Sequence, residues 1–278
     1  MFKSVFHLFM YPVLVYFLFS CNSNAAKKSS NAANNNNANE LDTSRAVIEA
    51  HSADSVFSSY PIDTIYPARI LTAEEAFHED EVDKRDRGRS WYGLFMNKEG
   101  YYLDSTRIIT KRVEDPTGED GNLNGWEVKT SNRDTSMLLI SGVDGLSKRK
   151  IVPVNIDRLE MFPGKSTTFS YNGITYTLYA TGNKGPGGDN YIVTSYRLFI
   201  KATINGMQRQ QLLVAEPAFN DAITTILFAG DIDGDGFPDF IIDTISHYNG
   251  ARPTLYLSKP AGGTQLLKVM GWHLSLGC

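Results

Sequence analysis

Four aspartates between positions 231 and 239 form the segment of the sequence with the most sharply defined chemistry. They are Asp231, Asp233, Asp235 and Asp239. The glycines at positions 234 and 236 let the chain turn tightly between them, because a positive φ costs glycine little. Calcium takes about six to eight oxygen ligands, whereas zinc and copper favour nitrogen and sulfur. We therefore expect a calcium ion held by the four carboxylates, the backbone carbonyl of Phe237 and water.

The spacing of the aspartates distinguishes this loop from an EF-hand, which needs a bidentate Glu at its twelfth position. The twelfth residue counted from Asp231 is Ile242. The pattern Asp-x-Asp-Gly-Asp-Gly-x-x-Asp, followed by apolar residues, resembles the calcium loop of FG-GAP and VCBS repeats, which form β-propeller blades. The resemblance implies that the four aspartates bind calcium between two strands. It covers about residues 225–257. A propeller needs several repeats, and the sequence holds one such loop. We therefore expect the calcium-binding loop of this family but not its propeller fold.

Polar residues that follow the loop are the candidates for catalysis beside a bound metal. Asp243, His247 and Tyr248 would suit a hydrolytic reaction in which His247 is the base for a metal-bound water. The sequence has no Gly-x-Ser-x-Gly, His-Glu-x-x-His or glycine-rich phosphate-binding motif. We therefore assign no catalytic residue, and the sequence favours a non-catalytic protein over an enzyme.

The N-terminus carries the second chemically distinctive residue, Cys21. Lys3 precedes an apolar run, Val5–Phe19, which is shorter than the roughly 20 residues that cross a bilayer. This order is typical of a signal peptide, here over residues 1–20. Its end, Leu-Phe-Ser-Cys, resembles the bacterial lipobox, in which the cysteine after the cleavage point receives a diacylglyceryl group and fatty acids such as palmitate. The resemblance implies that Cys21 is lipidated and anchors the protein to a membrane.

The segment after Cys21 predicts a disordered tether. Residues 22–39 consist of Asn, Ala, Ser and Lys, and this composition buries too little apolar surface to offset chain entropy. We expect the tether to extend over residues 21–66. In some bacterial lipoproteins, acidic residues directly after the cysteine direct export to the cell surface. Residues 22–39 contain none, which favours the periplasmic side of the outer membrane over the cell surface.

Short runs of alternating apolar and polar residues dominate the rest of the chain and predict strands. Asn-Gly pairs at 172–173 and 205–206 predict tight hairpin turns. Trp91–Met96 and Tyr101–Leu103 predict a further hairpin. The expected fold class is mainly β, with antiparallel sheets that form a sandwich or a curled sheet and with little helix.

The chain is long enough for one or two β modules. A Pro-Gly break divides it into an N-terminal module at 67–160 and a C-terminal module at 161–278, which carries the aspartate loop. One continuous domain is the alternative. A helix start is expected at residues 72–77, where Thr72 and Glu75 have the spacing of a capping box.

Aromatic residues of the first predicted hairpin are the candidates for a ligand surface. Trp91, Tyr92, Tyr101 and Tyr102 would suit a sugar, but aromatic side chains in strands more often pack in a core. We therefore expect packing for these residues, with sugar binding as the alternative.

Charge and motifs together predict a class of function. The net charge of −4 argues against a nucleic-acid partner, which would need a basic face. The expected function is that of a membrane-anchored lipoprotein of the cell envelope, with a calcium-stabilised β domain that binds or scaffolds an unidentified ligand. The candidate partner is an envelope protein or a glycan. The alternative is an envelope hydrolase that acts on glycans or phosphate esters near the metal loop.

Lipidation of Cys21 is tested by metabolic labelling with a palmitate analogue. We expect label on the wild-type protein and none on Cys21→Ala, because the lipidated thiol is then absent. Cys278→Ala is the matched control, since it removes the other cysteine and should keep the label. Unchanged labelling of Cys21→Ala would exclude this anchor.

Overall fold

The computed structural model describes residues 57–277, except 74, 116–122, 157–158 and 189–191. Cys21, the predicted signal peptide and most of the predicted tether lie outside these residues. Strands make up most of the described chain, and the helical segments are two short 3₁₀ turns, η1 (Lys84–Gly88) and η2 (Pro186–Gly188). The predicted fold class, mainly β with antiparallel sheets and little helix, is confirmed. Among the described residues, no helix has the length and apolar character needed to cross a membrane.

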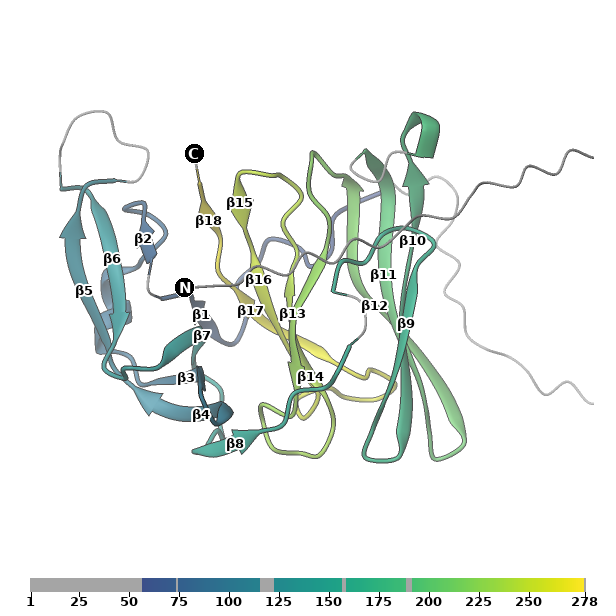
Figure 1. Cartoon of the computed structure of the whole chain (residues 1–278), viewed down its shortest axis with the longest axis horizontal. Helices are drawn as coiled ribbons and strands as arrows, with labels where there is room; N and C mark the ends of the chain where they lie inside the picture. Colours follow the sequence, from purple (N-terminus) through teal and green to yellow (C-terminus); the bar gives the residue numbers. More distant parts are fainter. Residues whose placement is uncertain (1–56, 74, 116–122, 157–158, 189–191, 278) are drawn as a thin grey trace, which may run out of the picture. The chain divides into compact units, whose positions relative to one another are not determined.

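A four-stranded antiparallel sheet forms the centre of the fold (Figure 1). Its strands in spatial order are β13 (Thr225–Gly230), β14 (Asp239–Asp243), β16 (Pro253–Leu257) and β17 (Lys268–Trp272). Every residue of β16 and all but the last of β14 are buried. Because neighbouring side chains of a strand point to opposite faces, this sheet must be covered on both sides.

One face of the central sheet packs against a five-stranded sheet. Its strands in spatial order are β1 (Arg69–Leu71), β7 (Thr135–Ser141), β3 (Trp91–Asn97), β4 (Gly100–Thr106) and β8 (Arg149–Ile151). The shared core joins Leu94 and Leu103 of this sheet to Ile241 and Leu255 of the central sheet. This core therefore contains residues from both sides of the predicted module boundary near residue 160, and the division into two modules stays a prediction.

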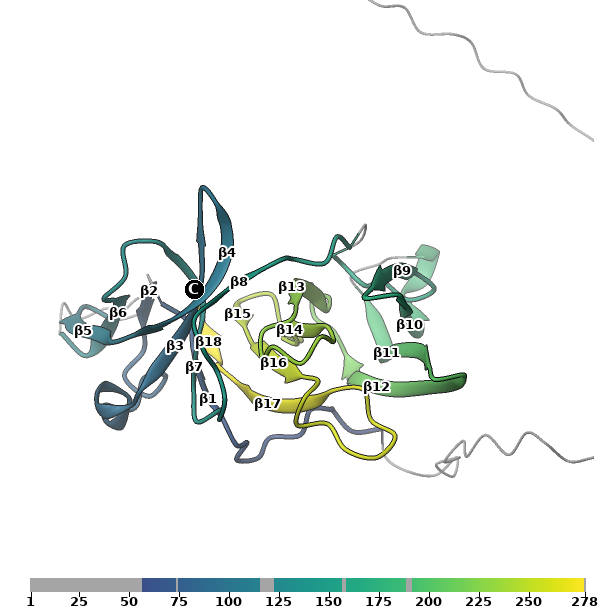
Figure 2. The same ribbon diagram turned by 90° about the horizontal axis from the view of Figure 1, so that it is seen from below.

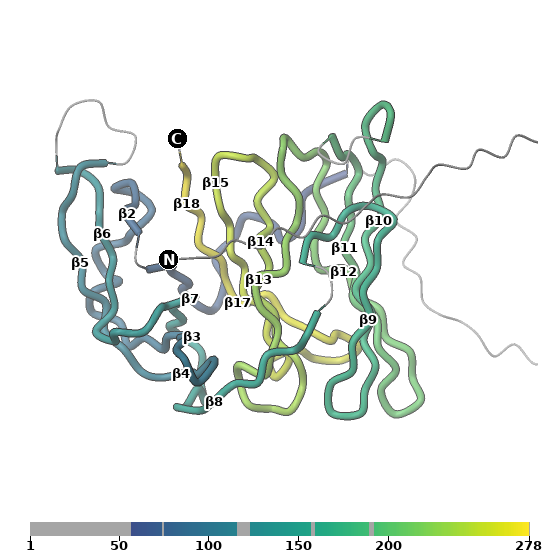
Figure 3. The backbone as a smooth tube through the Cα atoms, viewed as in Figure 1, coloured from purple at the N-terminus to yellow at the C-terminus, as the bar shows by residue number. Residues whose placement is uncertain are grey.

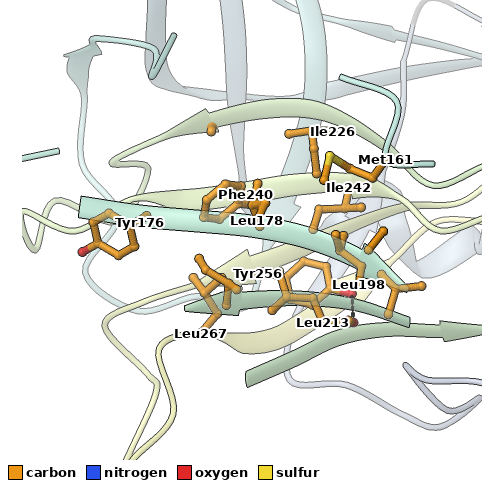
Figure 4. Close-up of a cluster of buried hydrophobic side chains, with 14 of the residues drawn as sticks. Met161, Tyr176, Leu178, Leu198, Leu213, Ile226, Phe240, Ile242, Tyr256 and Leu267 are labelled. Carbon is orange, nitrogen blue, oxygen red and sulfur yellow. Dashed lines mark hydrogen bonds between the residues drawn. The ribbon is translucent and has the colours of Figure 1, made fainter. Parts of the chain in front are cut away.

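The other face of the central sheet packs against a second four-stranded sheet (Figure 2). Its strands in spatial order are β12 (Met207–Ala218), β11 (Val193–Ile204), β10 (Ile174–Lys184) and β9 (Ser166–Tyr171). Leu178, Leu198 and Leu213 of this sheet meet Phe240 and Tyr256 of the central sheet (Figure 4). Phe240 and Ile241 thus serve opposite cores, as the alternation of a strand requires.

Two smaller sheets complete the described structure. The first contains β2 (Glu75–Phe77), β6 (Gly125–Thr130) and β5 (Ile108–Val113), and the second pairs β15 (Gly250–Ala251) with β18 (Ser275–Leu276). Phe77 and Val128 of the three-stranded sheet pack against Trp91 and Leu139. These two residues lie on the face of the five-stranded sheet that points away from the central sheet.

The two outer strands of the central sheet also have backbone partners. The chain that follows β8 runs beside β13 (Figure 3), where the amide of Val154 donates to Ala229 O at 2.8 Å. On the opposite edge, the amide of Ala68 donates to Met270 O of β17 at 2.8 Å. Such pairing satisfies backbone groups that an exposed edge strand would leave open.

The sequence predicted the tight turns correctly. Asn172 and Gly173 join β9 to β10 with φ values of 46° and 79°, and Asn205 and Gly206 join β11 to β12 with 52° and 75°. Positive φ at both turn residues is the requirement of a type I′ turn, which Asn-Gly meets best. The hairpin of β3 and β4 is also present as predicted.

The helix start predicted at residues 72–77 is wrong. Residues 75–77 form strand β2 and pair with β6, and the side chain of Phe77 is 1% exposed. The hydroxyl of Thr72 lies 3.0 Å from His273 Nδ1 and does not cap a helix. Strand pairing and burial of Phe77 therefore override the local capping signal.

Because β17 lies close to the chain before β1, we predict that Gly271 does not tolerate a larger residue. A Cβ at this position would lie 2.4 Å from Ala68 O, a backbone atom. Gly271→Ala should therefore lower the free energy of unfolding by about 1–3 kcal/mol, measured by urea denaturation. Gly262→Ala is the control, since no atom lies within 4 Å of its Cβ position, and its stability should stay within about 1 kcal/mol of wild type. Equal stability of the two variants would contradict the packing described here.

Candidate metal centre

The aspartate loop connects two adjacent strands of the central sheet. β13 ends at Gly230 and β14 begins at Asp239, and these two residues are paired in the ladder. Gly234 and Gly236 have φ values of 78° and 89°, so both adopt the left-handed conformation that glycine allows at low cost. The prediction that a strand leaves the loop is confirmed by β14.

Three of the predicted ligands converge. Asp231, Asp233 and Asp239 each place a carboxylate oxygen so that the three atoms lie within 4.8 Å of one another. Asp233 is 3% exposed and Asp239 is fully buried, whereas Asp231 is half-buried. Three carboxylates at such distances repel one another, and burial reduces the solvation that would stabilise their charges.

Backbone amides hold two of these carboxylates in place. The side chain of Asp231 accepts from the amides of Gly234 at 2.6 Å and Gly236 at 3.0 Å. Asp239 Oδ2 accepts from the amides of Ile232 at 2.6 Å and Asp233 at 2.9 Å. The loop is therefore wound around its own acidic side chains, and their positions are fixed by the backbone.

Asp233 provides the observation that bears most directly on a bound cation. Its Oδ2 accepts from the amide of Lys259 at 3.1 Å, but its Oδ1 is buried and has no hydrogen-bond partner within the described part of the chain. A buried polar atom without a partner is costly. A cation beside Asp231, Asp233 and Asp239 would satisfy this oxygen and neutralise the cluster. The donor set, all carboxylate oxygen, fits a hard divalent cation.

Burial and the neighbouring carboxylates raise the pKa values of the buried aspartates. Burial, together with the charges of Asp235 and Asp231, raises the pKa of Asp233 to about 6. Burial and the charge of Asp233 raise the pKa of Asp239 well above its ordinary value. The folded loop thus resists ionisation of its own carboxylates unless a cation compensates them.

Asp235 does not join the convergent group. Asp235 Oδ1 accepts from the amide of Phe237 at 2.9 Å and lies 2.9 Å from Ser258 Oγ. Asp235 is therefore turned toward the neighbouring strand end. Direct coordination by Asp235 and by the carbonyl of Phe237 stays a prediction.

Ser258 is a residue of the site that the sequence analysis missed. It follows β16, the strand next to β14, and its amide donates to Asp239 Oδ1 at 2.7 Å. Its hydroxyl lies 2.9 Å from both Asp235 Oδ1 and Asp239 Oδ1. One hydroxyl hydrogen can serve only one of these acceptors at a time. The only signal in the sequence is a polar residue directly after the apolar run of β16.

Two other segments touch the loop from outside. Asn172, at the tip of the β9–β10 hairpin, donates from Nδ2 to Gly236 O at 2.7 Å. Arg149 of β8 lies against Gly234, where an added Cβ would be 1.6 Å from its Nη1. The loop is thus contacted by residues from both sheets that cover the central sheet. Neither contact could be expected before the strand pairing was known.

The predicted catalytic neighbours lie elsewhere. Asp243 is at the far end of β14 from Asp239, about 13 Å away at the usual rise of an extended strand. His247 and Tyr248 follow further along the chain, and His247 Nδ1 bonds to the side chain of Asn249. His247 lies next to Asn220, at the end of the central sheet where Thr225 pairs with Asp243, and β14 separates it from the loop.

The aromatic candidates for a ligand surface divide into two groups. Trp91 is 1% exposed and belongs to the core, as expected for packing. Tyr92, Tyr101 and Tyr102 are half-buried. Tyr101 packs edge-on against Phe228 with ring centres 5.1 Å apart. Tyr101 and Tyr102 border a surface hollow.

The raised pKa of Asp233 predicts an unusual dependence of stability on pH in protein stripped of metal with a chelator. Between about pH 4 and 6, the folded protein keeps a proton on Asp233 that the unfolded chain has lost. Stability should therefore fall as the pH rises through this window.

Asp233→Asn should remove the contribution of Asp233 to this fall. That contribution is a change of roughly 2 kcal/mol in the free energy of unfolding between pH 4.5 and 7. The measurement is urea unfolding of wild type and variant at pH 4.5 and 7. Asp144→Asn, at an exposed aspartate, is the control and should follow the wild type. A wild type and an Asp233→Asn variant with the same pH slope would refute the environment assigned to Asp233.

Comparison of the chain with protein-family models, with curated proteins and with solved structures found no match. What this site can do is therefore argued from its own geometry. Three convergent carboxylates with one unpartnered buried oxygen suit cation binding, and none of the predicted catalytic neighbours lies beside them.

Proposed function

We propose that this chain is a lipid-anchored protein of the bacterial cell envelope, in which a calcium ion in the Asp231–Asp239 loop stabilises the β fold. Its role is to bind or scaffold another envelope molecule. The support comes from the lipobox-like sequence at Cys21, the FG-GAP-like spacing of the aspartates and the convergence of three of them in the fold.

The observation that carries the metal proposal is the unpartnered Oδ1 of Asp233. This oxygen is buried, and Asp233 is one of three residues, with Asp231 and Asp239, that each offer a carboxylate oxygen within 4.8 Å of the other two. Calcium accepts several carboxylates in an irregular arrangement, whereas magnesium favours an octahedral shell that retains water. The acidic and partly buried loop therefore favours calcium.

The proposed role of the ion is structural. The loop lies where β13 meets β14, and it is hydrogen-bonded to Asn172 of one neighbouring segment and Ser258 of another. An ion held there would fix the ends of several strands at once. The hydrolase alternative is disfavoured, because His247, the residue considered as its general base, follows the far end of β14 and lies away from the loop. A binding or scaffold role is therefore favoured.

The proposed location follows from the anchor. Two or three acyl chains hold a protein stably at a bilayer, and the absence of acidic residues in 22–39 favours the periplasmic side of the outer membrane. The partners in this proposal are the membrane, through the lipid on Cys21, and an envelope protein or glycan.

A calcium titration followed by thermal unfolding tests the metal site. A ligand that binds only the folded state raises its stability by about 2.7 kcal/mol at a hundredfold excess over the dissociation constant. For a chain of this size, that corresponds to a rise of about 5 °C or more in melting temperature. Asp233→Asn should abolish the calcium-dependent rise, whereas Asp144→Asn should keep it.

Terbium luminescence provides a direct readout of ion binding. Tyr171 lies close enough to Asp231, Asp235 and Asp239 for their charges to add to the effect of burial on its pKa. Excitation of this tyrosine should sensitise terbium emission, and calcium should compete the signal away. Tyr171→Phe should weaken the emission while the calcium-dependent melting shift persists. The absence of both signals at millimolar calcium would overturn the proposal.

A further inference from the structure

A surface hollow of about 420 Å³ lies beside the loop, at the edge where β4 pairs with β8. Tyr101 and Tyr102 contribute its aromatic part, and Lys148, Arg149 and Lys150 contribute its basic part. The volume is in the range of pockets that hold small ligands. No residue of this hollow belongs to the metal centre.

Within the described part of the chain, two of the three cations of the hollow form ion pairs and Arg149 does not. Lys148 Nζ pairs with Asp104 at 2.7 Å, and Lys150 Nζ pairs with Glu99 at 3.1 Å. Arg149 bonds only through Nε, to Ser147 O at 3.2 Å. Its two terminal amino groups have no hydrogen-bond partner among the residues that the structure describes.

The backbone places Arg149 against the outside of the aspartate loop, although none of the described residues forms an ion pair with it. Arg149 stands opposite Leu103 in the β4–β8 ladder, so its side chain lies on the face toward the central sheet. There the guanidinium reaches Gly234 at the outside of the loop. The carboxylates of Asp231 and Asp239 are turned inward to the loop's own amides. The guanidinium therefore keeps its charge available for another anion.

The aromatic residues of the hollow are held in fixed positions. The ring of Tyr101 packs edge-on against Phe228. The ring of Tyr102 stacks on Phe95 with centres 5.4 Å apart, and its hydroxyl donates to Asp134 at 2.6 Å. Side chains that are already ordered lose little conformational entropy when a ligand binds.

We propose that this hollow binds an acidic glycan, in which the carboxylate of a uronic acid pairs with the guanidinium of Arg149. A guanidinium matches a carboxylate in a two-point, charge-assisted hydrogen bond. Tyr101 lies on the same face of β4 as Leu103 and Arg149 and presents ring surface there, against which the apolar face of a sugar ring packs. Tyr102 lies on the opposite face of β4 and borders the other part of the hollow. This inference names the ligand of the proposed envelope-binding function and rests on it, but it does not require that the loop hold calcium.

Gly234 links the hollow to the loop. A side chain at this position would displace the guanidinium of Arg149, since a Cβ would collide with Nη1. Gly236 has a similar positive φ, but its Cβ would only reach normal contact with Asn172 at 3.7 Å. Gly234→Ala and Gly236→Ala therefore impose similar backbone strain, but only Gly234→Ala displaces the guanidinium of Arg149.

The test is isothermal titration of the full chain with a short glucuronate-containing oligosaccharide and with its neutral glucose counterpart. We expect binding of the acidic sugar only. Arg149→Gln should weaken it about tenfold or more, the usual loss for a charge-assisted hydrogen bond. Lys165→Gln removes the same charge at an exposed site directly before β9, outside the hollow, and should leave the affinity unchanged. Gly234→Ala should lose more affinity than Gly236→Ala.

Three results would overturn the inference. They are equal binding of the acidic and neutral sugars, equal losses in Arg149→Gln and Lys165→Gln, and equally tight binding of a poly-aspartate peptide, which would indicate recognition of charge alone. Terbium luminescence of the same samples separates this inference from the metal proposal. Arg149→Gln should keep the terbium signal, whereas a wild type that binds the sugar without binding terbium would contradict only the metal proposal.

Discussion

Burial of the central sheet on both faces is the constraint on which the rest of the described structure depends. Strands β14 and β16 are buried at nearly every position, so both faces of the sheet are shielded from water. The five-stranded sheet covers one face and the β9–β12 sheet covers the other. Apolar burial contributes about 25 cal/mol for each Å² removed from water, so two cores built on one sheet gain stability without a helix.

The same constraint places the acidic loop. Asp239 is the first residue of β14, and burial of that strand removes its carboxylate from water. The amide and hydroxyl of Ser258 lie beside it because β16 is the next strand of the sheet. A group that would prefer solvent is thus kept buried by the packing of its neighbours. The raised pKa of Asp233 and the unpartnered Oδ1 are the electrostatic consequences of this packing.

Local sequence predicted what depends on local chemistry. The Asn-Gly turns at 172–173 and 205–206 and the glycines at 234 and 236 have the positive φ values that their types suggested. The clustering of Asp231, Asp233 and Asp239 followed from the same reasoning. Sequence reasoning failed where distant pairing decides the outcome. The capping signal at Thr72 yielded to pairing with β6, and the roles of Ser258 and Arg149 depend on which strands become neighbours.

The hydrogen bond between Ala68 and Met270 has a consequence for the order in which this molecule can be assembled. Hairpins such as β9–β10 need only nearby residues and can form early. The apolar face of β1, β3 and β7 must wait for β17, which is synthesised long after these strands. Contacts of such long sequence separation slow folding and leave apolar strands exposed in the meantime. The apolar strands near the start of the described chain therefore stay vulnerable to aggregation until β17 has been synthesised and has packed against them.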